Sequence, residues 1–241
     1  MEKEDIVMTT IVGIKIGNGD NEGDKGVILA SDLAATRTNW IAQGDNAYRQ
    51  QTKSEAQKIY VDKKGELAVA MSGVIDKAYT NFLYNLLEGK IDFRAAVEKG
   101  FFPELERLTL TRFEGRLPQQ ENLNGLVVAT RYDGKPQLHS CFPLGRVCQR
   151  DWTSIGSGSE LAIRQISQYP KILPYHISLE EGVDLARTSL EKAEEDIYTG
   201  GLDLVVVTPD RILEFGELIK ERLRATRDRT IREIKEKLRS N

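Results

Sequence analysis

The order of strand and helix patterns along this chain limits its fold more than any other feature of the sequence. Patterns typical of strands come first, followed by helical patterns, more strands, more helical patterns and closing strands. This order lacks the regular strand–helix alternation of a doubly wound parallel sheet, so it disfavours a Rossmann fold. It favours antiparallel sheets packed together with helix pairs outside. Because the sequence contains no internal repeat and no linker, we predict one domain.

Two hairpins are predicted in the first third of the sequence. Thr10–Ile16 alternates apolar with small or polar residues, and a turn rich in Gly, Asn and Asp separates it from the apolar run 26–32. Lys58–Asp62 and Glu66–Ser72 form the second predicted hairpin. Between the hairpins, residues 37–55 are polar and show no period, so we predict a long surface loop there.

The same signals divide the rest of the chain. Ser178 followed by Glu181 has the spacing of a capping box, so we expect a helix to begin there. Alternating charges around a thin apolar stripe predict a charged C-terminal helix over 216–241, either surrounded by solvent or docked on a neighbouring subunit. The other helical patterns cover 74–87, 95–113 with a break near Pro103, and 160–168, and the other strand patterns cover 123–131, 137–142, 153–155, 202–207 and 212–215.

Composition excludes several functional classes. The formal net charge is −3, so no dominant positive field exists to collect phosphates, and we expect no nucleic-acid partner. The chain has no run of about 18 apolar residues, and its first residues are too few and too acidic for a signal peptide, so we expect no membrane partner. Cys141 and Cys148 are too few for a disulfide framework, which favours a reducing, cytoplasmic setting. With only His139 and His176 besides, we expect no His-rich metal site.

Thr9 and Thr10 stand at the head of the first predicted strand, behind residues 1–8. If a cut between Met8 and Thr9 removes those residues, Thr9 carries a hydroxyl nucleophile and an α-amino base together. The amino group has a reference pKa of about 7.7–8.0, so a sizeable neutral fraction exists near pH 7. A peptide nitrogen cannot act as this base, so the cut would create the competent nucleophile.

A threonine hydroxyl is a poor nucleophile that needs a nearby positive charge and donors for the oxyanion. If the two hairpins pair, Lys58 at the head of one strand and Asp32 at the end of another both reach Thr9. Asp32 would then keep Lys58 charged, and that charge would lower the pKa values of the hydroxyl and the amine. Gly73, predicted at a strand-to-helix turn, has an N–H that no side chain shields, and we expect it to serve the oxyanion.

Taken together, these segments resemble a β-type subunit of the 20S proteasome, within the N-terminal nucleophile hydrolase superfamily. The resemblance runs in order over residues 9–215, which chance motif matches do not do. It implies an α+β fold, a four-layer αββα sandwich of two antiparallel sheets flanked by helices, with a propeptide at 1–8 in front of it. The matching segments are TTIVGIKI (9–16), GVILASDLAAT (26–36), KIYV (58–61), LAVAMSG (67–73), IGSGSELA (155–162), SLEEGVDLA (178–186) and EDIYTGGLDLVVV (195–207).

The resemblance also implies roles for single residues. Thr9 falls on the catalytic threonine, Asp32 and Lys58 fall on the acid–lysine pair that supports it, and Gly73 falls on the glycine whose amide serves the oxyanion hole. Ser157 falls on the serine near the threonine's amino group. The remaining implied positions are Asp196 and Thr199, which support the same site, and Met71, Ala35 and Thr36, which bind substrate, with an apolar preference suggested by Met71.

The activity implied is that of a threonine endopeptidase, active without a cofactor, that cuts peptides or unfolded proteins inside stacked rings. Its partners would be identical or related ring subunits, α-type subunits and an ATP-dependent unfoldase. Met8 departs from the family, which usually has glycine there, and this keeps open a catalytically silent ring subunit that retains its propeptide. The sequence also leaves open an α-type subunit, a bacterial homologue such as the HslV peptidase, and a small-molecule amidase.

Overall fold

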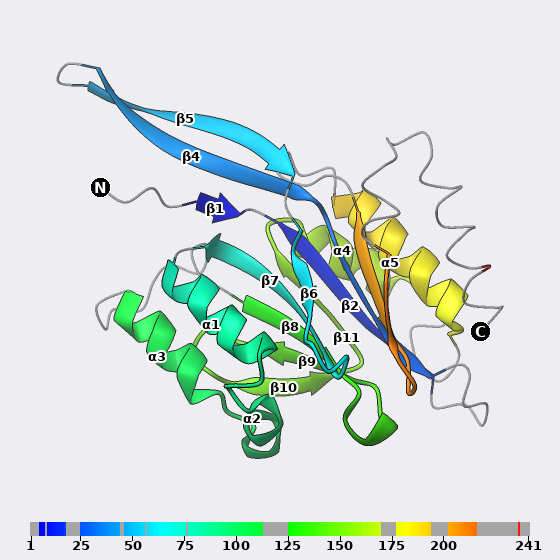
Figure 1. Cartoon of the computed structure of the whole chain (residues 1–241). Helices are drawn as coiled ribbons and strands as arrows, with labels where there is room; N and C mark the ends of the chain where they lie inside the picture. Colours follow the sequence, from blue (N-terminus) through cyan, green and yellow to red (C-terminus); the bar gives the residue numbers. More distant parts are fainter. Residues whose placement is uncertain are drawn as a thin grey trace.

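The fold is a sandwich of two antiparallel sheets with helices on both outer faces (Figure 1). Every strand pairing among the described residues is antiparallel. Each helix in this part of the chain is too short or too polar to cross a membrane. The computed structural model describes residues 5–7, 9–17, 25–43, 46–55, 57–75, 77–112, 125–169, 177–193, 202–215 and 236.

The first sheet has six strands in the order β1-β7-β8-β9-β10, with β6 also paired to β7. Because β8 occupies one edge of β7, strands β1 and β6 lie one behind the other along its opposite edge. The strands are β1 (Asp5–Val7), β6 (Ile59–Val61), β7 (Leu67–Ile75), β8 (Gly125–Thr130), β9 (Gln137–Cys141) and β10 (Val147–Arg150).

The second sheet has five strands in the order β11-β2-β3-β12-β13, which places β2 and β3 in its centre. The predicted hairpin of the first two apolar runs is confirmed as the β2–β3 pair, and the second predicted hairpin is confirmed as β6–β7. The strands of this sheet are β2 (Thr10–Ile16), β3 (Gly26–Ser31), β11 (Trp152–Gly156), β12 (Asp203–Val207) and β13 (Ile212–Glu214).

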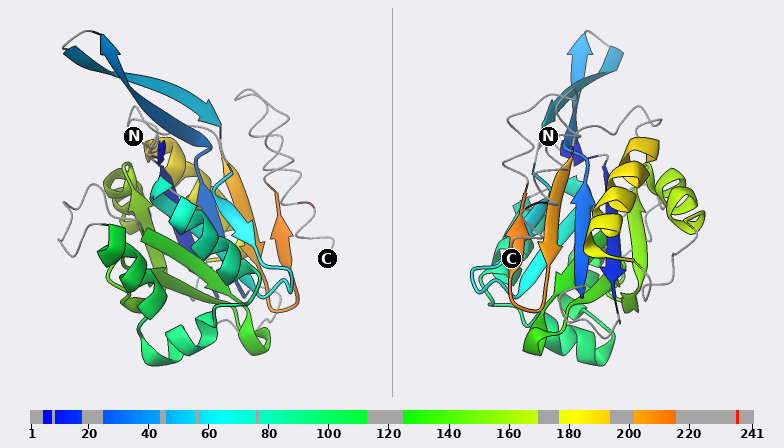
Figure 2. Two further views of the ribbon diagram at one scale, coloured as in Figure 1. Left: turned by 60° about the vertical axis from the view of Figure 1, so that its left-hand side comes forward. Right: turned by 90° about the vertical axis from the view of Figure 1, so that its right-hand side faces the viewer.

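Helices α1 (Lys77–Leu87), α2 (Phe93–Lys99) and α3 (Pro103–Arg112) cover the first sheet, and α4 (Ser159–Ser167) and α5 (Leu179–Ala193) cover the second (Figure 2). Sequence signals fix several of their ends. The predicted capping box before α5 is present: Ser178 N donates to the Glu181 carboxylate at 2.9 Å, and Glu181 N donates to Ser178 Oγ at 3.2 Å. A short 3₁₀ turn, Tyr132–Gly134, joins β8 to β9.

Alternation along the strands sorts the apolar side chains into three core layers. In β2, Val12 and Ile14 pack with α4 and α5, whereas Ile11 points between the sheets. In β7, Val69 packs under α1–α3, and its neighbour Ala68 points between the sheets. Two sheets with a buried layer between them and a helix layer on each side make the four-layer αββα sandwich that the family resemblance implied.

The prediction of a surface loop over 37–55 is wrong. These residues belong to a long hairpin of β4 (Ala34–Gln43) and β5 (Asn46–Glu55), paired from Ala34↔Glu55 to Gln43↔Asn46. The hairpin stands away from the sandwich (Figure 2). Backbone hydrogen bonds hold the two strands together. Because the hairpin lies outside the core, its sequence shows no alternation of apolar and polar residues that would predict strands.

Smaller corrections concern element boundaries. Val74 belongs to strand β7 and not to the first helix, so Gly73 lies inside a strand and not at a strand-to-helix turn. Strand β10 was not predicted, because its sequence VCQR is half polar and lies at the edge of the sheet. Almost all of the predicted C-terminal helix lies outside the described residues.

Candidate active site

Thr9 directly precedes β2, at the end of the sandwich where β3 finishes and β6 begins. It is fully buried, as is Thr10. Asp32 follows the last residue of β3, and Lys58 precedes the first residue of β6. Lys58 lies in the space between β1 and β6 along the edge of β7, where its carbonyl accepts a hydrogen bond from Met71 N at 3.4 Å. The two sheets thus bring three residues that are far apart in sequence to one place.

Thr9, Asp32 and Lys58 form one hydrogen-bonded group. Lys58 Nζ donates to Thr9 Oγ1 at 2.6 Å and to Asp32 Oδ2 at 3.0 Å. Thr9 Oγ1 in turn donates to Asp32 Oδ1, and Thr10 N donates to the same oxygen at 2.7 Å. The Thr9 hydroxyl is therefore oriented by both members of an ion pair, accepting from the ammonium and donating to the carboxylate.

The ion pair is almost completely removed from water, since the Lys58 and Asp32 side chains are each 1% exposed. Burial raises the pKa of Asp32, which Lys58 and the Thr9 hydrogen bond oppose. Burial lowers the pKa of Lys58, which Asp32 opposes. A positive charge this close to a hydroxyl favours its deprotonated form, and low local polarity strengthens that effect.

The segment Gly156-Ser157-Gly158 closes the site on the β11 side. Ser157 N donates to the Thr9 carbonyl at 2.8 Å, and Gly158 N donates to Thr10 Oγ1 at 3.0 Å. Gly156 has φ of +102°, and a Cβ there would overlap the Thr9 carbonyl. A Cβ at Gly158 would overlap Thr10 Oγ1, so the close approach of this turn to Thr9 and Thr10 requires both glycines. Ser157 itself is exposed, and it meets Thr9 through its backbone.

Strand β1 brings the residues that precede Thr9 along the edge of β7. Val7 pairs with Gly73, and Asp5 pairs with Ile75. Gly73 has φ of +112°, a conformation that favours glycine. The chain running into the Met8–Thr9 bond is thus held as an added antiparallel strand, although Met8 itself lies outside the described residues.

Of the remaining predicted site residues, only Met71 has a side chain that the structure describes. Met71 is 4% exposed and packs in the core under α1–α3, so its side chain faces the helix layer. Ala35 and Thr36 lie at the start of β4, where only the backbone is described. Asp196 and Thr199 lie outside the described residues.

Sequence reasoning missed two polar residues of this region. Thr10 contributes both its N–H and its hydroxyl to the group around Thr9, and its position beside Thr9 was the available signal. Asp203 is 1% exposed at the start of β12. A charged residue at the head of the otherwise apolar run DLVVV was the available signal for Asp203.

Comparisons with known proteins agree with this architecture. The family model described as "Proteasome subunit" matches residues 111–207. Proteasome subunit beta 1 of Thermococcus onnurineus is 30% identical over 224 residues, covering 90% of this chain and 95% of that protein. Proteasome subunit beta 1 of Thermococcus gammatolerans is 27% identical over 218 residues, covering 88% and 95%. Proteasome subunit beta 2 of Sulfurisphaera tokodaii is 28% identical over 195 residues, covering 80% and 82%. With this fold and this coverage, the chain belongs to the proteasome subunit family, as a β-type subunit of the 20S proteasome.

Proposed function

We propose that this chain is a threonine endopeptidase that frees its own N-terminal nucleophile, Thr9, and then cleaves peptide bonds. The observation that carries the proposal is the position of Thr9 Oγ1 between Lys58 Nζ, at 2.6 Å, and the Asp32 carboxylate. A buried hydroxyl with a cation on one side and a proton acceptor on the other has the partners that an activated nucleophile needs.

Self-cleavage comes first. The Thr9 hydroxyl attacks the carbonyl carbon of Met8 and gives up its proton, for which Asp32 is in hydrogen-bonding position. The C–N bond breaks, the nitrogen takes a proton, and the acyl group moves to the oxygen as an ester. Water then hydrolyses the ester, which releases residues 1–8 and leaves Thr9 with a free amine. Strand β1 supports this step because it holds the residues before the bond in an extended conformation.

Peptide hydrolysis then uses the same hydroxyl. It attacks a peptide carbonyl while the Thr9 amine takes its proton, directly or through water or Ser157, and the Gly73 amide stabilises the oxyanion. The C–N bond breaks, the departing amine receives the proton, and an ester to Thr9 remains. Water hydrolyses this ester. In both reactions, the proton transfers and the new bonds involve only side chains, the Thr9 amine, the peptide and water.

The partners follow from the family. Proteasome β-type subunits assemble with related ring subunits, and we infer that this chain acts on peptides or unfolded proteins in such a ring. Rings of α-type subunits and an ATP-dependent unfoldase would complete the particle. We therefore expect the isolated monomer to be weakly active or inactive.

A mass spectrum of assembled particles tests the proposal together with hydrolysis of a fluorogenic peptide. The expected result is a chain that begins at Thr9 and hydrolyses the peptide, whereas Thr9→Ala keeps residues 1–8 and shows background turnover. Thr9→Ser is the matched control, because it retains the hydroxyl and should retain some of both activities. An intact, inactive wild-type chain in assembled particles would instead identify a silent ring subunit.

A further inference from the structure

Asp203 is a buried carboxylate one strand away from Asp32. It is the first residue of β12 and is 1% exposed. In the register of the second sheet it lies directly opposite Ser31, the residue before Asp32, and Ser31 lies opposite Ile11. The row Ile11–Ser31–Asp203 therefore crosses three neighbouring strands immediately beside the Thr9 end of the sandwich.

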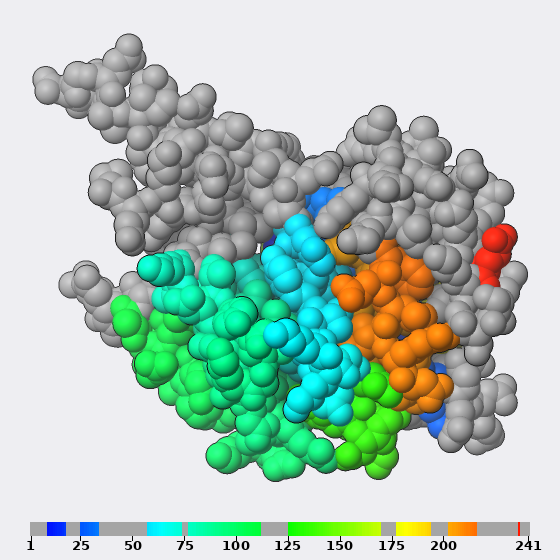
Figure 3. Space-filling view, viewed as in Figure 1, coloured from blue at the N-terminus to red at the C-terminus, as the bar shows by residue number. Residues whose placement is uncertain are grey.

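Strand alternation shows which way Asp203 points. Val205 and Val207 belong to the core layer between the two sheets, and residues two apart on a strand share a face. Asp203 therefore points into the same layer. Lys58 Nζ lies 3.0 Å from Asp32 Oδ2, and Asp32 follows Ser31, the residue opposite Asp203. Strands β6 and β12 pack against each other, and β6 lies beside the β12–β13 hairpin on the face drawn in Figure 3.

We propose that Asp203 is a positioning residue of the Thr9 site, a second buried carboxylate that keeps the Lys58 ammonium protonated. Asp203 does not touch the reacting atoms in this role. It acts through Lys58, whose electrostatic effect on the Thr9 hydroxyl depends on its positive charge.

The charge balance of the site gives a reason for two carboxylates. Before cleavage, Lys58 is the cation beside Asp32, and Asp32 also accepts hydrogen bonds from the Thr9 hydroxyl and from Thr10 N. Cleavage adds the Thr9 amine, which is partly charged near neutral pH. A second cation next to Lys58 would favour loss of the lysine's proton. Asp203 offsets that second positive charge, so the site holds two cations and two anions.

The electrostatic environment agrees with this arrangement. Burial lowers the pKa of Lys58, whereas Asp32 and then Asp203 raise it. Burial and Asp203 both raise the pKa of Tyr60, the titratable residue of β6. Removing the charge of Asp203 should therefore lower the pKa of Lys58, and the group would lose its proton at a lower pH.

The test is a titration of Lys58 by NMR, with ¹³C-labelled lysine side chains in the full chain. Thr9→Ala serves as the background, because it keeps the chain as one unprocessed species whether or not the proposed function is right. Adding Asp203→Asn should lower the Lys58 midpoint by about one pH unit, the usual effect of losing one close opposite charge. Adding Lys58→Met identifies the resonance by its disappearance.

Thr130→Val is the matched control. It changes a buried polar side chain in β8 whose hydroxyl has no hydrogen-bond partner in the described part of the chain, so it tests perturbation of a buried strand without loss of charge. It should leave the Lys58 midpoint in place. An unchanged midpoint in Asp203→Asn, or an equal shift in Thr130→Val, would overturn the proposal.

A second measurement covers the case in which Asp203→Asn does not fold. The ¹³C shift of the Asp203 carboxyl in the Thr9→Ala chain should show an ionised group at pH 7, and Lys58→Met should raise its midpoint. A protonated Asp203 at pH 7 would contradict the proposal. So would an Asp203 titration midpoint that Lys58→Met leaves unchanged.

The consequence for activity rests on the proposed function. In a chain with Thr9 intact, Asp203→Asn should move the alkaline limit of peptide turnover about one unit to lower pH, because loss of the Lys58 proton removes the charge beside Thr9. An unmoved limit would count against Asp203. A wild-type chain without turnover would contradict the proposed function alone, since the two titrations still decide the role of Asp203.

Discussion

An ion pair flanks β6 at each end, and the two pairs differ in their access to water. Before the strand, Lys58 Nζ lies 3.0 Å from Asp32 Oδ2, and both side chains are 1% exposed. After it, Lys63 Nζ lies 2.8 Å from Glu88 Oε1, with side chains 77% and 21% exposed. The exposed pair has the shorter distance, yet water and salt screen it. The buried pair acts in a medium of low polarity, where a charge changes the chemistry of its neighbours.

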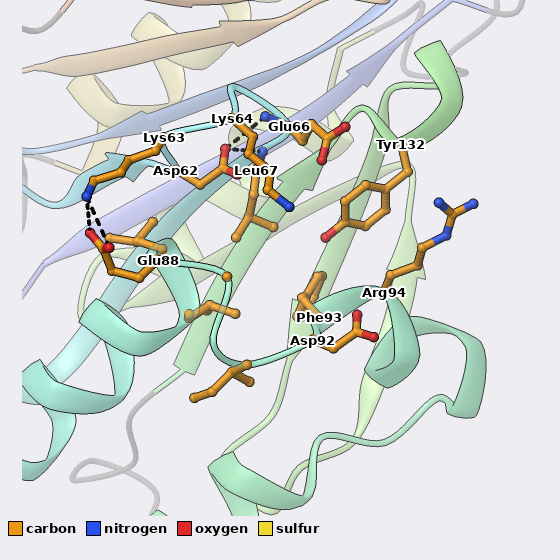
Figure 4. A pocket seen from close by; sticks show the side chains of 14 residues that line it. Asp62, Lys63, Lys64, Glu66, Leu67, Glu88, Asp92, Phe93, Arg94 and Tyr132 are labelled. Carbon is orange, nitrogen blue, oxygen red and sulfur yellow. Dashed lines mark hydrogen bonds and ion pairs between the residues drawn. The ribbon is translucent and has the colours of Figure 1, made fainter.

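The exposed end also contains a pocket of about 600 Å³, between the β6–β7 turn, the end of α1 and the start of α2 (Figure 4). Its carboxylates hold the backbone in place. Asp62 Oδ1 accepts hydrogen bonds from Glu66 N and Leu67 N, both at 2.8 Å, and shapes the turn. Asp92 caps α2 by accepting from Ala95 N at 3.1 Å. Similar residue types thus maintain the fold at one end of β6 and surround the candidate nucleophile at the other.

Lys58→Ala should have the largest effect, because it removes the cation and leaves Asp32 buried without its ionic partner. We expect peptide turnover and removal of residues 1–8 to fall to background. The free energy of unfolding should fall by about 3–5 kcal/mol, the usual cost of breaking a buried pair. Mass spectrometry, a turnover assay and urea unfolding measure the three effects. Normal turnover would show that the buried charge is not needed, and the contrast between the two ends would lose its functional meaning.

Gly156→Ala and Gly89→Ala compare a glycine beside Thr9 with one away from it, since both residues have positive φ. At Gly156 the added methyl group would overlap the Thr9 carbonyl, whereas at Gly89, with φ of +70°, nothing lies within 4 Å of it. We expect Gly156→Ala to cost about 3–4 kcal/mol of stability and to displace Thr9, with a matching loss of turnover. Gly89→Ala, the control, should cost about 1 kcal/mol and spare turnover. Equal costs would show that the close approach to Thr9 is not restrictive.

His139 provides a buried titratable group without an ionic partner among the described residues. Burial, and to a smaller extent Lys15, lowers its pKa from 6.5 to about 4. Above pH 6.5 both the folded and unfolded states hold a neutral imidazole. Between 6.5 and 4 only the unfolded state gains the proton, so stability falls as the pH falls, by about 3 kcal/mol at pH 4. Urea unfolding at a series of pH values should show this slope in the wild type.

His139→Phe is the control for that slope. It replaces the ring in its contact with Phe93 by another aromatic ring and removes the titration. In this variant, the free energy of unfolding should fall less between pH 6.5 and 4, by the amount that His139 contributes in the wild type. An identical decline in both proteins would assign the acid sensitivity to other groups.

The fold could be predicted from the sequence where apolar residues repeat at the period of a strand or helix, because that repeat marks a face buried in the core. The β2–β3 and β6–β7 hairpins have such a pattern, because each strand faces a core layer. The β4–β5 hairpin has none, because backbone pairing outside the sandwich leaves no period to detect. The resemblance to a known family placed Thr9, Asp32 and Lys58 in one site, and the structure brings their polar atoms within hydrogen-bonding distance.

The candidate site was less predictable where it depends on register. Asp203 comes beside Ser31 only because β12 pairs with β3 in one specific alignment, and a single sequence does not specify which strands pair or in what register. The need for glycine at Gly156 likewise arises from the approach of the Thr9 carbonyl, a contact between distant segments.

Lys63→Ala should have the smallest effect, although it breaks the shorter of the two ion pairs. The Glu88 hydrogen bond raises the pKa of Lys63, but the ammonium stands in water, and when it is removed water solvates the Glu88 carboxylate in its place. Neither the unfolding midpoint nor peptide turnover should change measurably relative to Lys64→Ala, which alters the neighbouring exposed lysine of the same turn. The comparison is sharpest at low ionic strength, where screening is weakest. A loss of turnover in Lys63→Ala alone would mean that the far end of β6 acts on Thr9, so exposure to water would no longer separate the structural pair from the chemical one.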